Sequence, residues 1–369
     1  MQRHFNKRVM SFIVVGVVLA GALAAYLRQG HSAHPLVHVD TDRFAVMGTF
    51  ARIHLRCIDE QTGRSAIEQA MLALDRVDRL MSTYRQDSEL SEVNRNAGYK
   101  PVGVSAETYN LLAKAQHYAK MTSGAFDITV TPLLRTWQLA TKNNHLPTAE
   151  ELDRTRVKIG YDKLVLSEPA ERRVTFMTPD MEVNVDALAK GYAVDRALAT
   201  LRRKGVSAAL VEIGGEVACF GQDRPGQNWL VGIQDPFADD NDNPLSERAR
   251  WVMALHDASV ATSGNYRRLV MVAGQPISHI IDPRTGSPAA ALPSVTIIAP
   301  RAVDADAIAT AVSVMGPEEG IKLVESLPEM EAFLIAGTKQ QPVIYRSSGF
   351  SRFEVPTKQN KNLVTSHLD

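Results

Sequence analysis

The sequence predicts an α+β protein with one folded domain that follows a hydrophobic N-terminal segment. Helical and strand-like patterns are mixed along the 369 residues without regular β–α–β alternation, which argues against a doubly wound parallel sheet. Hydrophobic residues make up 45% of the chain and charged residues 22%, a balance typical of folded domains with a sizeable core. A chain of this length leaves open whether the domain divides into two subdomains.

The first 30 residues predict a signal peptide or a membrane anchor. Arg3, Lys7 and Arg8 precede an uncharged run, residues 9–27, that is rich in Val, Leu and Ala. A basic flank before such a run stays in the cytoplasm while the following chain is exported. The run is near the lower limit of about 17–25 residues for a spanning helix. Cleavage and anchoring both remain open, and both predict a protein at the periplasmic face of the cytoplasmic membrane.

A polar linker over 31–40 leads into a predicted domain over 41–355. Residues 44–58 alternate as a strand, and apolar residues over 66–84 recur at the spacing of an amphipathic helix. Ser105 caps a second predicted helix that ends near Met121, before Gly124. Two further short strands are predicted at 164–176 and 181–185.

The second half of the domain begins with a predicted helix over 186–204, which Gly205 ends. A buried strand over 208–213 runs into Gly214-Gly215, and an acidic, turn-rich loop occupies 236–247. The remaining predicted elements are strands at 251–255, 268–272 and 295–299, a helix at 304–315, and a polar tail at 356–369.

Charge and cysteine content narrow the function classes. The 41 basic and 41 acidic residues give a formal net charge of zero, without the basic excess of a nucleic-acid-binding protein. The two cysteines, Cys57 and Cys219, lie far apart in apolar stretches, so we expect two buried free thiols rather than a disulfide.

Residues 278–310 carry the strongest chemical signal. Asp306 and Thr310 are four apart in a helical run, so their oxygens lie on one face. Hard cations such as Mg²⁺ take oxygen ligands and usually bridge to substrate phosphates. His279 can serve as a general base, and Asp282 stands beside it in a turn-forming segment. We therefore expect a metal-assisted phosphate reaction, although each residue alone has a structural alternative.

Two glycine-containing segments add to this signal. Gly214-Gly215 follows a strand and precedes Glu216, so its backbone N–H groups can approach an anionic ligand. Lys190-Gly191 lies inside a predicted helix, where glycine costs roughly 1 kcal/mol relative to alanine. Either a ligand passes close to Lys190, or Gly191 serves packing alone.

Taken together, the motifs resemble the FAD:protein FMN transferase family, also called the ApbE family. The resemblance runs from about Met47 to Gly316. It rests on the order and number of segments that are weak singly: 47–49, 81–84, 87–90, 124–127, 132–133, Trp137, 189–195, 214–216, 262–266, 279–286 and 305–310.

The resemblance implies a transferase that moves FMN from FAD to a threonine of an acceptor protein through a phosphoester, with release of AMP. FAD is then a substrate and Mg²⁺ the cofactor. The expected acceptor belongs to an exported or membrane electron-transfer complex, and no nucleic-acid partner is expected. The resemblance assigns His279 and Asp282 to catalysis and Ala189, through its carbonyl, Asp306 and Thr310 to the metal. The expected nucleotide-binding residues are Met47, Tyr84, Asp127, Lys190, Gly214, Gly215, Glu216, Thr262 and Ser263.

The sequence departs from the family pattern at Asn184, Asp186 and Glu212. All three are near the expected nucleotide site, so they bear on FAD affinity, acceptor choice or the metal shell. Two other functions remain on the same scaffold. One is a Mg²⁺-dependent pyrophosphatase that splits FAD into FMN and AMP, and the other is a flavin-binding module without turnover.

Overall fold

The computed structural model describes residues 36–238, 249–264, 269–356 and 365–366. The predicted signal or anchor segment therefore lies outside the described residues, together with residues 31–35 of the linker, most of the polar tail and residues 239–248 of the acidic loop. Within the described ranges, no helix is both long and hydrophobic enough to cross a lipid bilayer.

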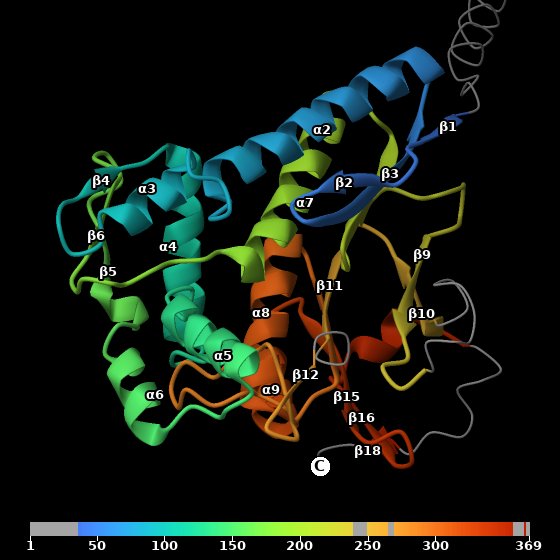
Figure 1. Cartoon of the computed structure of the whole chain (residues 1–369). Helices are drawn as coiled ribbons and strands as arrows, with labels where there is room; N and C mark the ends of the chain where they lie inside the picture. The colour runs from blue at the N-terminus through green and yellow to red at the C-terminus, as the bar shows by residue number, and fades with distance from the viewer. Residues whose placement is uncertain (1–35, 239–248, 265–268, 357–364, 367–369) are drawn as a thin grey trace, which may run out of the picture. The chain divides into compact units, whose positions relative to one another are not determined.

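A ten-stranded sheet forms the centre of the body that begins at His38 (Figure 1). Its strands follow the order β1-β3-β7-β8-β11-β14-β15-β16-β18, with β2 paired to β3. The neighbours β16 and β18 run parallel, whereas β3, β7, β8, β11, β14 and β15 run antiparallel in succession. The bounds are β1 Val37–Asp40, β2 Phe44–Val46, β3 Thr49–Cys57, β7 Ala208–Ile213, β8 Glu216–Phe220, β11 Ser259–Gly264, β14 Ser294–Ala299, β15 Glu331–Gly337, β16 Pro342–Arg346 and β18 Thr365–Ser366.

Helices and a second sheet cover opposite faces of this sheet. In β7, Ala209 and Val211 enter the core shared with the helices, while Ala208 and Leu210 enter the core shared with the second sheet. This is the alternation expected of a strand buried on both faces. The second sheet joins β17 (Glu354–Val355), β10 (Ala249–Leu255) and β9 (Trp229–Gln234). Two small sheets complete the strands: β4 (Val102–Gly103), β6 (Arg173–Phe176) and β5 (Leu164–Leu166) in one, β12 (Val270–Val272) and β13 (Gln275–Ile277) in the other.

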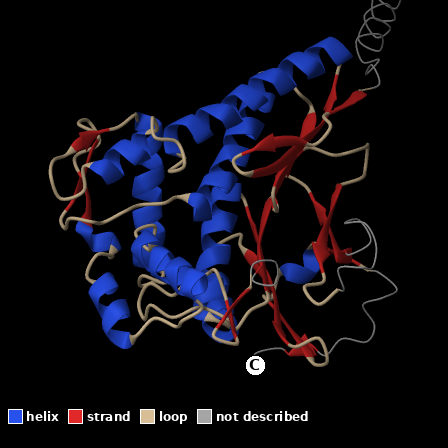
Figure 2. Ribbon diagram, in the orientation of Figure 1, coloured by secondary structure: helices blue, strands red, loops and turns tan. Residues whose placement is uncertain are grey.

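The helices gather on one side of the ten-stranded sheet, and the small sheet of β4, β6 and β5 lies beyond them (Figure 2). Three of them, α2, α7 and α8, contribute most of the helical side of the main core. The described helices are α2 (Glu60–Met81), α3 (Glu89–Arg95), α4 (Ala106–Met121), α5 (Thr131–Asn143), α6 (Ala149–Arg156), α7 (Asp186–Arg203), α8 (Ala302–Met315) and α9 (Pro317–Glu325).

Helices α7 and α8 approach each other closely at Gly191. A Cβ atom added there would lie 2.3 Å from the carbonyl oxygen of Ala302 and 2.8 Å from the amide nitrogen of Val303. Backbone atoms cannot yield as a flexible side chain can, so only glycine fits this position. The glycine inside the helix therefore serves helix packing, and it brings α7 next to the start of α8.

The start of α8 is capped by a side chain of α7. Both oxygens of Asp195 accept backbone hydrogen bonds, from Ala302 N at 2.8 Å and from Val303 N at 3.1 Å. Arg301, at the position that precedes the helix, provides no side-chain cap of its own. Asp195 thus satisfies amide groups that a helix start otherwise leaves without partners.

This buried cap makes stability depend on pH. Burial raises the pKa of Asp195 from 3.8 to about 6. Between these values the folded protein holds a proton that the unfolded chain has released, so the free energy of unfolding falls as pH rises through the window. The expected fall from this group approaches about 3 kcal/mol. Urea unfolding gives the free energy of unfolding of the wild type and of Asp195→Asn at a series of pH values. The contribution of Asp195 is the change with pH in the difference between these two free energies. An identical pH dependence in the two proteins would contradict the assignment.

Most of the predicted elements are confirmed, with corrected bounds. The Ser105-capped helix is α4, the strand at 208–213 is β7, and Gly205 ends α7 with a φ of +77°. The predicted strand at 164–176 is two strands, β5 and β6, joined by a turn. Both cysteines are buried free thiols, as expected.

The predicted strand at 181–185 is wrong. Val183 and Val185 are buried, which produced the strand-like pattern, but the segment carries no ladder hydrogen bonds. Instead, the amide side chain of Asn94 donates to Val183 O and accepts from Val183 N, both at 2.9 Å. A single side chain therefore satisfies the backbone that a neighbouring strand would otherwise pair.

Candidate active site

A buried charge cluster joins α7, α8 and β8. Lys190 Nζ lies 3.1 Å from Glu216 Oε1 and also donates to the carbonyl of Asp186 at 3.1 Å. Asp306 Oδ2 accepts from Gly191 N at 3.0 Å, so Asp306 lies at the point where α7 and α8 touch. Both carboxylates are buried. The structure thus brings together three predicted site residues that are distant in sequence.

The cluster contains more negative charge than the lysine can balance. Burial raises the pKa of Glu216 to about 7, against the attraction of Lys190, and burial also raises the pKa of Asp306. Burial disfavours the charged lysine, but Asp306 and Glu216 outweigh this and raise its pKa. Glu216 Oε2 is buried without a hydrogen-bond partner among the described residues. A buried, partnerless carboxylate oxygen is costly unless a cation or donor occupies the site in function.

A cleft of about 110 Å³ opens beside this cluster. Thr310, one helical turn after Asp306, lines it together with Asp127, Asn184, Asp186 and Ala187. Apolar walls come from the segment before α5, from α5, from the segment after His279 and from α8, through Ala125, Phe126, Ile128, Val130, Leu134, Ile281, Pro283 and Val314. A cleft with apolar walls and a few convergent polar groups is the usual form of a small-molecule site.

The donor set fits a hard dication such as Mg²⁺. Asp306 and Thr310 offer a carboxylate and a hydroxyl from adjacent turns of α8. Ala187 lines the cleft, one helical turn before Gly191, whose amide donates to Asp306 Oδ2. The Ala187 carbonyl therefore lies close to the carboxylate at the cleft. Oxygen donors of these three kinds are those that Mg²⁺ accepts in proteins.

This geometry favours Ala187 over Ala189 as the backbone ligand. Ala189 is buried inside α7 and does not line the cleft. The difference of two residues turns the carbonyl to another side of the helix. The signal that sequence reasoning missed is the position of Ala187 in the cleft wall, which only the packing of α7 beside α8 reveals.

Two turns and one strand that are predicted to bind the nucleotide lie side by side. Met47, with a φ of +47°, forms the tight turn between β2 and β3. Gly214 N donates to Phe50 O at 3.0 Å, which holds the turn between β7 and β8 against β3. Gly215 adopts a φ of +144° and lies close to the carbonyl of Thr262 on β11. Ser263 follows on the same strand. Met47, Gly214, Gly215, Thr262 and Ser263 therefore lie at the same end of the neighbouring strands β3, β7, β8 and β11.

Two predicted nucleotide-binding residues differ sharply in exposure. The side chain of Tyr84 is 85% exposed, and its neighbour Thr83 accepts a hydrogen bond from Asn184 at 3.4 Å, which places this segment near the cleft. Asp127 is buried and accepts from Thr129 N, Thr129 Oγ1 and Tyr161 N. Burial raises the pKa of Asp127. Asp127 therefore shapes the cleft wall, whereas Tyr84 offers a free ring face.

The segment after β13 carries the two predicted catalytic residues. His279 is exposed, two residues before Ile281 of the cleft wall. Asp282 is bound through both carboxylate oxygens by the guanidinium of Arg284, at 2.9 Å each. Asp282 also accepts from Arg284 N, so it organises the turn, and this geometry does not favour a catalytic role for it. Trp137 of α5 donates to Gly286 O at 2.8 Å and ties the segment to the cleft.

The departures from the expected pattern are at the cleft and on β7. Asn184 Oδ1 accepts from Asp186 N at 2.7 Å and its amide donates to Asp186 Oδ2 at 3.1 Å. Both side chains line the cleft, where they add polar groups beside Thr310. Glu212 is half-buried on β7 opposite Arg52 of β3. The motif residues Asn265 and Tyr266 lie outside the described residues.

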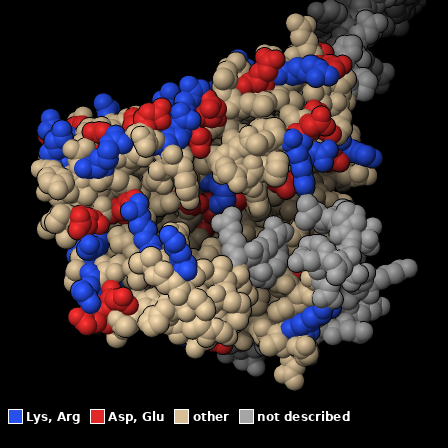
Figure 3. Space-filling view, viewed as in Figure 1, with Lys and Arg blue, Asp and Glu red and all other residues tan. Residues whose placement is uncertain are grey.

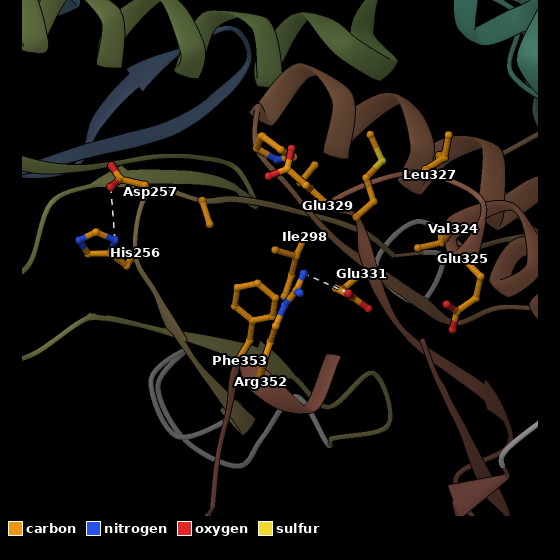
Figure 4. A pocket seen from close by; sticks show the side chains of 14 residues that line it. His256, Asp257, Ile298, Val324, Glu325, Leu327, Glu329, Glu331, Arg352 and Phe353 are labelled. Atoms are coloured by element: carbon orange, nitrogen blue, oxygen red, sulfur yellow. Dashed lines mark ion pairs between the residues drawn. The ribbon is translucent and has the colours of Figure 1, made fainter. Parts of the chain in front are cut away.

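A larger cavity, of about 400 Å³, contains none of the predicted site residues (Figure 4). Its lining is acidic, with Asp257, Glu325, Glu329 and Glu331 against Arg352, which pairs with Glu331. Glu325 accepts from Ser348 N and Ser348 Oγ. Because this cavity contains none of the predicted residues, the smaller cleft is the better candidate for the active site.

Surface charge supports a small-ligand site rather than a broad electrostatic interface. On the face shown in Figure 3, acidic and basic side chains are interspersed, and a large area below the centre carries neither. A nucleic-acid-binding face would present a basic stripe.

The chain is similar in sequence and in fold to known proteins. The profile of the ApbE family matches residues 47–334. The FAD:protein FMN transferase of Escherichia coli K12 is 33% identical over 282 residues, which cover 75% of this chain and 79% of that protein. Two solved structures share the fold. The flavin transferase ApbE from Vibrio cholerae has a TM-score of 0.73 at 30% identity, covering 86% of this chain and 100% of its own. The ApbE protein from Thermotoga maritima has a TM-score of 0.74 at 31% identity, covering 87% and 100%.

Proposed function

We infer that this chain, which belongs to the ApbE family, is a FAD:protein FMN transferase. The observation that carries the reaction class is the cluster beside the cleft, in which partly exposed Lys190 faces the buried carboxylates of Glu216 and Asp306. Glu216 Oε2 in this cluster has no hydrogen-bond partner among the described residues. A diphosphate carries its charge on oxygens, and a site for it needs cationic groups and a metal held by carboxylates.

We propose that the acceptor group is a threonine hydroxyl. Its oxygen would form a bond to the phosphorus of the FMN half of FAD, and the bridging P–O bond would break. AMP would leave with the bridging oxygen, and the hydroxyl proton would pass to a base. The products balance as the phosphoester-linked flavin protein, AMP and one proton.

The residues of this chain would divide that work. Asp306, Thr310 and the Ala187 carbonyl would hold Mg²⁺, which supplies positive charge to the diphosphate oxygens when bound. Lys190 adds a fixed positive charge from α7. The turn of Gly214 and Gly215, which has no side chains, would let the nucleotide approach the backbone closely. The exposed ring of Tyr84 would stack on a flat ligand. His279 would accept the threonine proton.

We propose that the reaction takes place at the periplasmic face of the cytoplasmic membrane. The support is the basic flank and uncharged run of residues 1–27. The expected acceptor is a threonine-bearing protein of an exported or membrane electron-transfer complex.

One assay separates the transferase from its two alternatives. The full chain is incubated with FAD, Mg²⁺ and an acceptor domain, with a second acceptor in which the target threonine is valine. Covalent flavin fluorescence on the threonine acceptor alone supports the transferase. FMN and AMP released at the same rate with either acceptor would identify a pyrophosphatase. Bound, intact FAD in both mixtures would identify a binding module.

Replacement of the proposed base gives a prediction for His279. In His279→Ala, we expect turnover to fall by about a hundredfold or more, because general base catalysis contributes roughly 10²–10⁴. The affinity for FAD should change by less than about threefold. Transfer reactions that are quenched at fixed times measure turnover, and equilibrium fluorescence titration measures the affinity for FAD.

The matched control is His256→Ala, which removes an exposed histidine from the larger cavity, and it should behave as wild type. A loss of FAD affinity with unchanged turnover in His279→Ala would move His279 from proton transfer to binding.

A further inference from the structure

Three side chains of metal-binding type converge at the edge of the ten-stranded sheet. His38 and Asp40 lie on β1, and His54 lies on β3. His38 Nε2 is 2.5 Å from Asp40 Oδ1, and His54 Nδ1 is 3.0 Å from the same oxygen. One ligand atom from each residue lies within 4.8 Å of the other two. None of the three belongs to the active site described above.

The strand geometry explains why the three groups meet. Residues two apart on a strand point to the same face, so His38 and Asp40 project together from β1. Thr41 N donates to Ile53 O at 3.0 Å, and this hydrogen bond aligns β1 with β3 and brings His54 opposite. The imidazole rings are nearly parallel, at 14°, with centroids 6.1 Å apart. The two rings thus flank one carboxylate oxygen.

The separations are close to those of a coordination sphere. Zinc takes histidine nitrogen and carboxylate oxygen at about 2.0–2.2 Å in a tetrahedron, which implies roughly 3.3 Å between ligand atoms. The nitrogen–oxygen separations of 2.5 and 3.0 Å therefore need to open by less than about 1 Å. The side chains of His38 and Asp40 are 40% and 33% exposed, so an ion and a completing water have access.

The neighbouring guanidinium of Arg56 is paired with Asp223, so it does not occupy Asp40. Arg56 Nη2 lies 2.5 Å from Asp223 Oδ1, and Arg56 Nε donates to the Asp223 carbonyl at 2.6 Å.

We propose that His38, Asp40 and His54 form a second metal site, for a transition-metal dication of the Zn²⁺ type. Two imidazoles and one carboxylate suit such an ion, whereas Mg²⁺ prefers oxygen ligands alone. The ion would lie between His38 Nε2, His54 Nδ1 and the Asp40 carboxylate, and each neutral imidazole would carry its proton on the other ring nitrogen. By joining β1 to β3, it would fasten the edge strand where the folded body begins.

The test measures zinc binding in the presence of excess magnesium. The metal-stripped full chain is titrated calorimetrically with Zn²⁺ in a large excess of Mg²⁺, which occupies oxygen-rich sites. We expect one equivalent of zinc that Mg²⁺ does not displace. His38→Gln and His54→Gln should each lower the affinity by more than the roughly 10–100-fold cost of losing an outer-shell partner. The double variant should lose the equivalent.

Two controls separate this site from other histidines and from the active site. His256→Gln removes the histidine of an exposed His–Asp pair that has no second imidazole, and it should retain full zinc binding. Asp306→Asn should also retain the equivalent. Co²⁺ should give the visible bands of a four-coordinate ion in wild type and not in the double variant.

Transferase activity with Mg²⁺ and circular dichroism should be unchanged in both histidine variants, which excludes misfolding. Undiminished zinc binding in the double variant would overturn the proposal. So would the absence of a magnesium-resistant equivalent in the wild type.

Discussion

Replacement of Asp306 by alanine should reduce flavin transfer by about a thousandfold or more while the protein remains folded. Asp306 supplies the one carboxylate expected to hold the metal, and loss of a preorganised electrostatic group of this kind costs roughly 10²–10³ in turnover even where no metal is involved. Stability should change little, because the lost Gly191 hydrogen bond is offset by removal of a buried charge. The measurement is covalent flavin per acceptor against time, with chemical denaturation as the check of folding.

Asp304 provides the matched control on the same helix. Its carboxylate is fully engaged by Arg301 at 2.8 Å, Lys114 at 2.7 Å and the hydroxyl of Tyr118. Asp304→Asn should therefore lower stability, by about 1–3 kcal/mol, with transfer retained at saturating FAD and Mg²⁺. Near-normal transfer in Asp306→Ala, or equal loss of transfer in both variants, would remove Asp306 from the metal site.

Replacement of Lys190 by methionine should impair both activity and stability. Methionine keeps the length of the side chain but removes the positive charge beside Glu216 and Asp306. Breaking a buried ion pair on one side costs about 3–5 kcal/mol, because the remaining charge is left uncompensated. Transfer should fall by about a hundredfold or more, since Lys190 also faces the diphosphate in the proposed site. Thermal and denaturant unfolding, together with turnover at saturating FAD, measure the two effects.

The double variant Lys190→Met with Glu216→Gln separates the two contributions. It removes the buried pair as a unit, so stability should largely return while activity stays low. Lys322→Met is the control, because Lys322 pairs with Glu319 on the surface and should be neutral. If Lys190→Met kept full stability, the charge of Lys190 would not be compensating the carboxylates.

Elements with a regular spacing of apolar residues could be predicted from the sequence. Elements without such a spacing, which either bury none of their residues or are buried along almost their whole length, could not. Helix α6 buries none of its residues, so it has no apolar face to detect, and only its Thr148–Glu151 capping box marks it. The strand β15 is a continuous buried run, which periodicity cannot distinguish from helix. The segment 181–185 has the reverse problem, since it is buried and extended but bonds to Asn94 rather than to a strand.

In the candidate site, residues of a single element could be paired from the sequence, whereas residues of different elements could not. Asp306 and Thr310 could be paired from helical spacing, because both belong to one helix. The partnership of Lys190 with Glu216 depends on how α7 packs against β8, and no local pattern encodes it. Ala187 is a better ligand candidate than Ala189 because the packing of the folded chain places Ala187, and not Ala189, in the cleft wall. The resemblance assigned Asp282 to catalysis, and the structure adds that Arg284 binds both of its carboxylate oxygens within a turn, which the residue order alone did not reveal.

The contact at Gly191 also limits how the protein can move. With the backbone of α7 resting on the backbone of α8, neither helix can slide or rotate without lifting off the other. We therefore expect Lys190 and Asp306, which lie on either side of this contact, to keep their relative positions as the protein fluctuates. Any movement that opens or closes the site around a nucleotide would then occur in the surrounding turns, while Lys190 and Asp306 keep fixed positions in the rigid contact between α7 and α8.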